Sequence, residues 1–149
     1  MTLELDLQLA NESIPVPDKN EFEVWVKSAI ENMDKVNLTI RIVDETESKM
    51  LNETYRKKTG ATNVLSFPAE TREFVPELLG DIVICAEKVI NEAEQQNKNV
   101  INHWAHLVIH GVLHLLGYDH INDTDAEVME AKEIAILKSL GYENPYLGH

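Results

Sequence analysis

The sequence has little cysteine, no long apolar run and half as many basic as acidic residues. Its one cysteine, Cys85, has no partner in the chain, so no intrachain disulfide forms and a reducing compartment is expected. No apolar stretch approaches the ~18 residues that a membrane-spanning helix needs, and the first residues lack the basic and apolar segments of a signal peptide. These absences predict a cytoplasmic protein that does not enter a membrane.

The excess of acidic residues limits the partners. Against 26 Asp and Glu stand 13 Lys and Arg, which gives a net charge of −13 at pH 7. Such a charge opposes indiscriminate binding to DNA, RNA or anionic membranes. Residues 41–72 hold six basic and five acidic residues, a net charge of +1, whereas the rest of the chain carries −14. Any nucleic-acid contact is therefore expected to be local, and neither DNA nor a membrane is expected as a partner.

The length and the pattern of apolar residues predict one domain that spans residues 1–149. Alternating or short apolar runs predict strands at residues 3–9, 37–43, 63–67 and 78–86. Helical spacing predicts helices from Asp18 to about residue 30, and at residues 46–58, 87–96, 100–116 and from Thr124 onward. We therefore expect an α+β fold, with a mixed sheet of about four strands packed against helices.

Several apolar residues are expected to face the core of this domain. In the helix predicted at residues 46–58, these are Met50, Leu51 and Tyr55. In the last helix, Val128 is expected to point inward, whereas the acidic residues from Asp123 to Glu133 are expected to form a solvated face. Cys85 lies in an apolar run and is expected to be a buried structural thiol.

Five of the six histidines lie between positions 103 and 120. On a helix, His110 and His114 are one turn apart and point the same way. Gly117 suits the end of that helix, and the following turn can bring His120 back to the same point. Three imidazoles suit zinc or a similar transition metal and leave one position open for water, as catalytic sites do. We predict one zinc ion held by His110, His114 and His120.

Three neighbouring residues extend this cluster. His103 and His106 lie on the same helical face as His110, and we expect them to be hydrogen-bonded core groups or partners of the ligands. Asp119 precedes His120 and is expected to orient a ligand imidazole, with proton transfer as the alternative role.

The spacing of the histidines also matches zinc peptidases. Ligands at i, i+4 and i+10 with a glycine at i+7 are typical of metzincins. Zinc peptidases with an HExxH motif use the glutamate after the first histidine as the general base, but Gly111 stands there. Peptide hydrolysis by that route would lack its base.

The densest basic run is Tyr55-Arg-Lys-Lys58. The guanidinium of Arg56 has a rigid fork that suits two phosphate oxygens, and a nearby metal would add positive charge. A solvated helix end explains the run equally well. Spacing alone does not say whether Arg56 faces the histidines.

Residues 110–120, His110-Gly-Val-Leu-His114-Leu-Leu-Gly-Tyr-Asp-His120, resemble the H-G-x-L-H-L-x-G-Y-D-H signature of the bacterial YbeY family of metal-dependent endoribonucleases. Two further parts of the chain also fit that family: Leu51-Asn-Glu-Thr-Tyr-Arg56 followed by Thr62-Asn-Val-Leu-Ser-Phe-Pro68, and Leu79-Gly-Asp-Ile82. The resemblance covers essentially the whole chain.

The resemblance implies a single-strand-specific endoribonuclease that matures the 3′ end of small-subunit ribosomal RNA and acts in ribosome quality control. It implies zinc on the three histidines, Arg56 as the basic residue important for activity, and a metal-binding helix near a mixed sheet. The ribosome or its small subunit is the implied partner. Whether water or the ribose 2′-OH attacks the phosphate is left open. A non-catalytic ribosome-assembly factor, stabilised by its metal, is the alternative.

Overall fold

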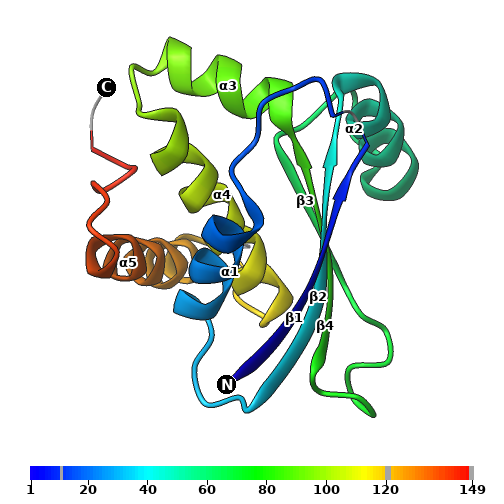
Figure 1. Ribbon diagram of the computed structural model, residues 1–149, viewed down its shortest axis with the longest axis vertical. Helices are drawn as coiled ribbons and strands as arrows, with labels where there is room; N and C mark the ends of the chain where they lie inside the picture. Colours follow the sequence, from blue (N-terminus) through cyan, green and yellow to red (C-terminus); the bar gives the residue numbers. More distant parts are fainter. Residues whose placement is uncertain (11, 120–121, 148–149) are drawn as a thin grey trace.

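A four-stranded mixed sheet forms one side of the molecule in the computed structural model, which describes residues 1–10, 12–119 and 122–147 (Figure 1). Its strands are β1 (Thr2–Leu9), β2 (Lys35–Val43), β3 (Val64–Pro68) and β4 (Leu78–Cys85). They lie in the order β1-β2-β4-β3; β1, β2 and β4 are parallel, whereas β3 is antiparallel to β4. The expected α+β fold with a mixed sheet of about four strands is confirmed.

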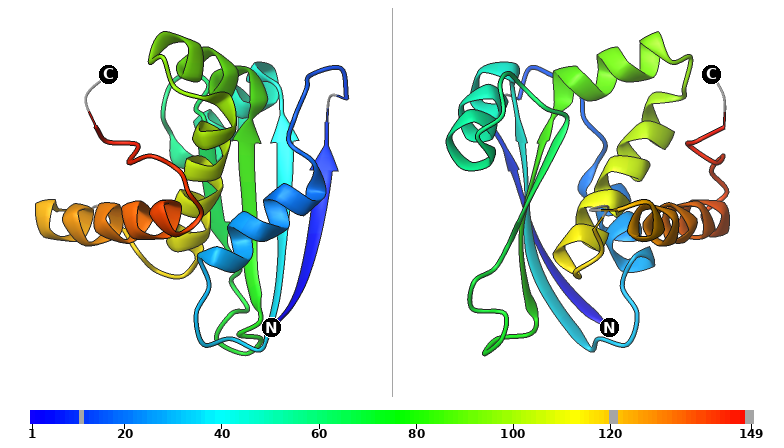
Figure 2. Two further views of the ribbon diagram at one scale, coloured as in Figure 1. Left: turned by 60° about the vertical axis from the view of Figure 1, so that its left-hand side comes forward. Right: turned by 180° about the vertical axis from the view of Figure 1, so that it is seen from behind.

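The helices cover mainly one face of this sheet (Figure 2). Helices α1 (Lys19–Ser28) and α4 (Val100–Leu115) pack on the sheet, and α5 (Asp123–Ser139) lies on the side of α4 away from it. Helix α3 (Ala86–Gln95) follows β4 directly. Among the described residues, no helix has the length and apolar content needed to cross a membrane.

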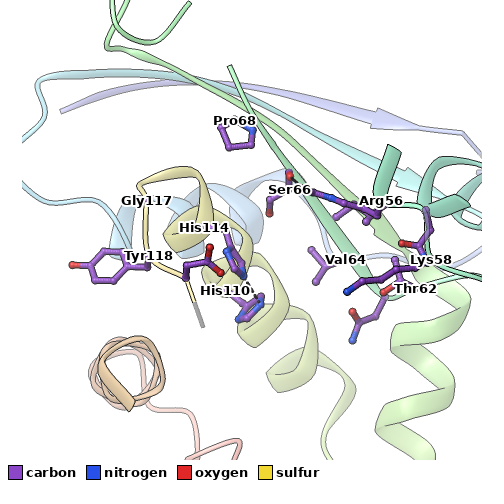
Figure 3. A pocket seen from close by; sticks show the side chains of 14 residues that line it. Arg56, Lys58, Thr62, Val64, Ser66, Pro68, His110, His114, Gly117 and Tyr118 are labelled. Atoms are coloured by element: carbon purple, nitrogen blue, oxygen red, sulfur yellow. Dashed lines mark hydrogen bonds between the residues drawn. The ribbon is translucent and has the colours of Figure 1, made fainter. Parts of the chain in front are cut away.

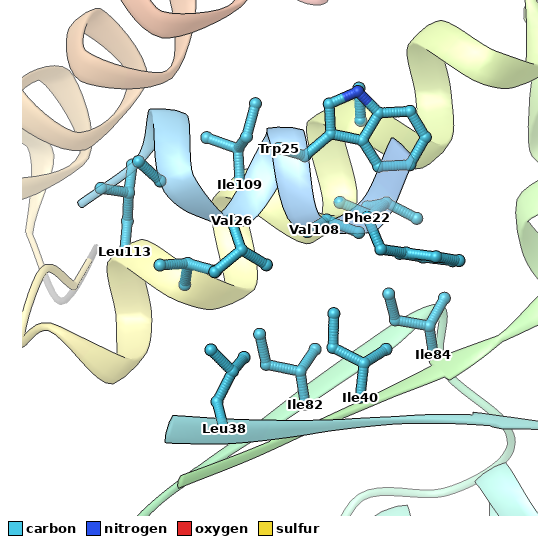
Figure 4. Close-up of a cluster of buried hydrophobic side chains, with 14 of the residues drawn as sticks. Phe22, Trp25, Val26, Leu38, Ile40, Ile82, Ile84, Val108, Ile109 and Leu113 are labelled. Atoms are coloured by element: carbon cyan, nitrogen blue, oxygen red, sulfur yellow. The ribbon is translucent and has the colours of Figure 1, made fainter. Parts of the chain in front are cut away.

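Apolar side chains from the sheet, α1 and α4 form the main core (Figure 4). Ile40, Ile82 and Ile84 of the sheet are fully buried beneath α1 and α4. The side chains above them include Phe22, Trp25, Val26, Val108, Ile109 and Leu113. Because interiors are close-packed, this contact holds α4, the histidine-bearing helix, at a fixed position relative to the sheet.

Gly111 allows α4 to approach the sheet closely. A Cβ atom at this position would lie 3.0 Å from Cγ2 and 3.2 Å from Cδ1 of Ile82. On the neighbouring strand, the hydroxyl of Ser66 donates to the carbonyl of Gly111 at 3.3 Å. A side chain at position 111 would therefore require Ile82 or α4 to shift by a few tenths of an ångström.

We expect Gly111→Ala to lower the free energy of unfolding by about 1–2 kcal/mol. Overpacking a core costs about 1–3 kcal/mol, and the higher helix propensity of alanine offsets up to about 1 kcal/mol of that loss. Urea denaturation of both proteins measures the difference. In an Ile82→Ala background, where the obstructing atoms are absent, the same substitution should stabilise the protein. Equal losses in both backgrounds would contradict the close approach.

The helix predicted at residues 46–58 differs from expectation. Helix α2 (Glu45–Leu51) continues into a π-helical turn, η1 (Asn52–Arg56). Met50 and Tyr55 are 53% and 63% exposed, so the prediction that they face the core is wrong. Polar side chains face inward instead because they hold the following loop: Ser48 donates to the carbonyl of Thr62 and Asn52 to that of Gly60.

The last helix is also rotated relative to expectation. Its N-cap is Asn122, whose side chain accepts from the backbone N–H of Asp125, so α5 begins before Thr124. Val128 is 54% exposed, and the buried residues are Met129, Glu133, Ile136 and Leu137. The expectation that Glu133 belongs to a solvated face is therefore wrong, and α5 buries a carboxylate against α4.

Candidate metal centre

A cavity of about 540 Å³ opens between α4, the edge strand β3 and residues 52–63 (Figure 3). His110 and His114 line one wall and Arg56 and Lys58 line another. Asp119 also lines the cavity, and its proposed effect on a ligand imidazole stays a prediction. His120 lies outside the described residues. The cavity thus brings together two predicted metal ligands and the predicted catalytic arginine, which are far apart in sequence.

The two cavity histidines face each other through their ring nitrogens. Nε2 of His114 lies 3.1 Å from Nε2 of His110. Two imidazole nitrogens on one tetrahedral zinc ion, each at about 2.0–2.1 Å, would be roughly 3.3 Å apart. The spacing of the two donors therefore fits a shared metal ion with little rearrangement.

The other ring nitrogen of His110 is held by a buried carboxylate. Nδ1 of His110 donates to Oε2 of Glu133 at 3.0 Å, across the contact between α4 and α5. Because an ionised carboxylate only accepts hydrogen bonds, Nδ1 carries the proton. In the neutral imidazole the lone pair is then on Nε2, the atom that faces His114.

Glu133 is fully buried and remains ionised. Its Oε1 accepts from Nε2 of His106 at 2.8 Å and from the hydroxyl of Tyr146 at 2.5 Å. Burial alone would raise the pKa of Glu133, but the hydrogen bonds from His106 and His110 outweigh burial and lower its pKa to about 2. Burial, together with Glu133, raises the pKa of Tyr146 and keeps its hydroxyl protonated.

His106, His110 and Glu133 also form a group that could hold a metal ion by itself, because one ligand atom from each lies within 4.8 Å of the others. Its distances of 2.8 and 3.0 Å are those of ordinary hydrogen bonds from imidazole to carboxylate. Of these three residues, the described lining of the cavity includes only His110. A metal bound there would lie on the α5 side of His110, away from Arg56.

Replacing Glu133 by glutamine is expected to weaken metal binding about 10- to 100-fold, since partners of metal-bound histidines contribute that much. The amide keeps the shape of the carboxylate but presents an N–H group to one imidazole, so the orientation of His110 is no longer fixed. Calorimetric zinc titration measures the affinity, and ¹⁵N-detected NMR reports which nitrogen of His110 is protonated. Glu127→Gln, an exposed change on the same helix, is the control. Equal affinities in the two variants would contradict this role.

The role of His106 stays a prediction, because this histidine is partly buried, hydrogen-bonded to Glu133 and part of the group that could itself hold a metal ion. His103 is a hydrogen-bonded core group, as predicted. His103 is 5% exposed, and its Nε2 lies 2.9 Å from Oε1 of Glu92. Burial would raise the pKa of Glu92, but hydrogen bonds with His103 and Asn63 lower it. Cys85 is buried, as expected of a structural thiol.

Arg56 closes the cavity from the side of β3. It is the last residue of the π-helical turn, and Lys57, in the left-handed region at φ 58°, ends that turn. Nη2 of Arg56 donates to the backbone carbonyl of Ser66, and the guanidinium lies 5.4 Å from the ring centroid of Phe67. The backbone of the edge strand therefore anchors the guanidinium at the rim of the cavity.

Gly111 has no room for the general base of a zinc peptidase. Even a Cβ atom there would meet the side chain of Ile82 in the core. The position that supplies the base in HExxH enzymes thus serves helix–sheet packing in this chain.

Glu133 and Tyr146 are functional candidates that the sequence analysis missed. A signal for Glu133 was present, because it lies at helical spacing between Met129 and Leu137, within the apolar stripe of α5. A carboxylate in such a stripe needs buried partners, which identifies it as a candidate for pairing with the histidines.

Comparisons with known proteins cover most of the chain. Residues 6–141 match the family described as Endoribonuclease YbeY. The chain is 56% identical over 145 residues to Endoribonuclease YbeY of Methylococcus capsulatus strain Bath, covering 97% of this chain and 95% of that protein. The solution structure of TM1509 from Thermotoga maritima has the same fold, with a TM-score of 0.56 and 24% identity over 93% of this chain and 92% of that one.

Proposed function

The chain belongs to the YbeY family of endoribonucleases, and we propose that it cleaves single-stranded RNA in the cavity between α4 and β3. The ion would be zinc, one per chain, on His110, His114 and His120; another transition metal suits the same donors. The observation that carries this proposal is the approach of the two Nε2 atoms, 3.1 Å apart, on a cavity wall opposite Arg56. His120 joins the set on its sequence spacing.

A bound metal would polarise a phosphoryl oxygen and lower the pKa of water. The residues of the chain would bind the phosphate and orient the metal ligands. Arg56 has further guanidinium donors besides the one on Ser66 and would stabilise the charge that develops on the phosphate. Lys58 adds a second positive charge to the lining. Glu133 holds His110 so that its lone pair faces the cavity. The nucleophile that attacks the phosphate is either water or the ribose 2′-OH.

In the cell, we place this activity in ribosomal RNA processing in the cytoplasm. The resemblance of residues 110–120 to the family signature supports maturation of the 3′ end of small-subunit RNA and a role in ribosome quality control. The ribosome or its small subunit would then present the RNA. Its participation also suits a protein with a net charge of −13, which has little general attraction for RNA.

The metal-loaded protein is expected to cut a single-stranded RNA and to leave a perfectly paired duplex and a denatured protein substrate intact. Gel electrophoresis of all three substrates, with and without a chelator, tests this expectation. Cleavage of the denatured protein alone would favour the peptidase alternative. No cleavage of any substrate, together with lower thermal stability in chelator, would favour the assembly factor that uses its metal only for folding.

A further inference from the structure

An exposed aromatic side chain lies immediately before the cavity arginine. Tyr55 is 63% exposed although its neighbour Arg56 lines the cavity. The ring of Tyr55 is held against Phe67 in a T-shaped contact, with centroids 5.7 Å apart and planes at 76°. A tyrosine fixed in this way offers a large apolar surface to a ligand at low cost in conformational entropy.

The aromatic pair lies at the free edge of the sheet. Phe67 pairs with Asp81 and Ser66 pairs with Ile82, and successive strand residues point to opposite faces. The hydroxyl of Ser66 reaches Gly111 of α4, so Phe67 faces the other side of the sheet. Arg56 connects the two sides, because it donates to the carbonyl of Ser66 and lies over the ring of Phe67. Tyr55 therefore lies beyond the edge strand β3, on the opposite side of the sheet from the histidines.

Basic residues also connect the cavity with the aromatic pair. Arg56, Lys57 and Lys58 are consecutive, in a chain whose net charge is −13. Arg56 and Lys58 line the cavity, and Tyr55 adjoins this basic run. Sites for single-stranded nucleic acids combine a basic path for the phosphates with aromatic rings on which bases stack.

We infer that Tyr55, supported by Phe67, is a stacking platform for an unpaired nucleobase of the RNA strand that leaves the cavity over β3. The inference rests on the proposed function, because that function supplies the strand. An aromatic face accepts any of the bases, so the platform would not read sequence. Bases of a duplex are already paired and stacked, so this contact favours single strands.

Binding of fluorescent single-stranded RNA to wild type, Tyr55→Ala and Tyr55→Phe tests the platform. Fluorescence anisotropy in chelator keeps the RNA intact. We expect Tyr55→Ala to weaken binding about 5- to 150-fold, the range for loss of one base–aromatic stack, and Tyr55→Phe to stay within about twofold of wild type. Oligo-A and oligo-U should respond alike. Thermal unfolding of the variants shows whether the fold is retained.

A second series uses RNAs in which one base at a time is removed. At one position, loss of the base should weaken binding to wild type and have no further effect in Tyr55→Ala. Equal binding by wild type and Tyr55→Ala, or a base-removal penalty that is the same in both proteins, would overturn the platform. Cleavage by metal-loaded wild type is assayed in parallel. If metal-loaded wild type cleaves RNA but binding does not depend on Tyr55, only the platform is refuted. If binding depends on Tyr55 but no RNA is cleaved, only the proposed nuclease activity is refuted.

Discussion

His114→Ala is expected to lose its bound metal and, with it, the cleavage of RNA. Closed zinc sites with four ligands have binding free energies of about 10–16 kcal/mol. If the four ligands contribute equally, loss of one lowers the affinity roughly 100- to 1,000-fold. The imidazole of His114 faces His110 at 3.1 Å and lies partly open on the cavity wall, so its removal leaves the core packing of α4 intact. Elemental analysis of the purified protein and an RNA cleavage assay measure the two losses.

His106→Ala is the matched control, because the two candidate metal sets share only His110. His106 is on the same helix, two turns before His114, and bonds Glu133. If the metal lies in the cavity, His106→Ala retains most of its metal. Its metal affinity should fall by no more than about 10- to 100-fold, the usual effect of losing a residue that supports a ligand without binding the metal. Loss of metal from His106→Ala together with full retention by His114→Ala would place the ion on His106, His110 and Glu133 instead.

Arg56→Ala is expected to keep its metal and to lower kcat for RNA cleavage about 100- to 1,000-fold, the usual loss when a donor to developing negative charge is removed. Arg56 lines the cavity with the histidines, yet its guanidinium contacts Ser66 and Phe67 of β3. Metal affinity should therefore be unchanged while the chemical step slows. Single-turnover cleavage kinetics and metal content, measured on one preparation, separate the two quantities.

Arg41→Ala serves as the control for this loss of charge. Arg41 pairs with Glu47 at 2.7 Å and does not line the cavity. Since exposed ion pairs contribute about 0–1 kcal/mol, the variant should fold and cleave RNA like wild type. Equal slowing by both substitutions would mean that general electrostatic attraction, not a local contact at the phosphate, accounts for the effect of Arg56.

The sequence was sufficient wherever a local pattern determines structure. Alternating leucines predicted β1, and the one-turn spacing of His110 and His114 placed both imidazoles on one face of α4. Gly117, at φ +104°, ends that region as expected of a left-handed residue. These features depend on neighbours within a few residues, so periodicity and end signals identify them.

Local sequence patterns could not predict long-range contacts or non-standard helical geometry. Arg56 lines the same cavity as the histidines because β3, which holds its guanidinium, joins the edge of the sheet next to α4. The π-helical turn changes the direction of the side chains after Leu51, so the regular helical face predicted for Tyr55 was wrong. For Glu133, its acidic neighbours suggested a solvated face, whereas packing of α5 on α4 decided its burial.

The most direct test is a stoichiometric one: the rate of single-stranded RNA cleavage by chelator-treated protein, followed as zinc is returned in fractions of an equivalent. The account predicts that the rate rises linearly to one equivalent per chain and then stays constant, and that His114→Ala remains at the baseline throughout. Metal-independent cleavage, or equal rates in wild type and His114→Ala, would contradict an RNA-cleaving metal centre on α4.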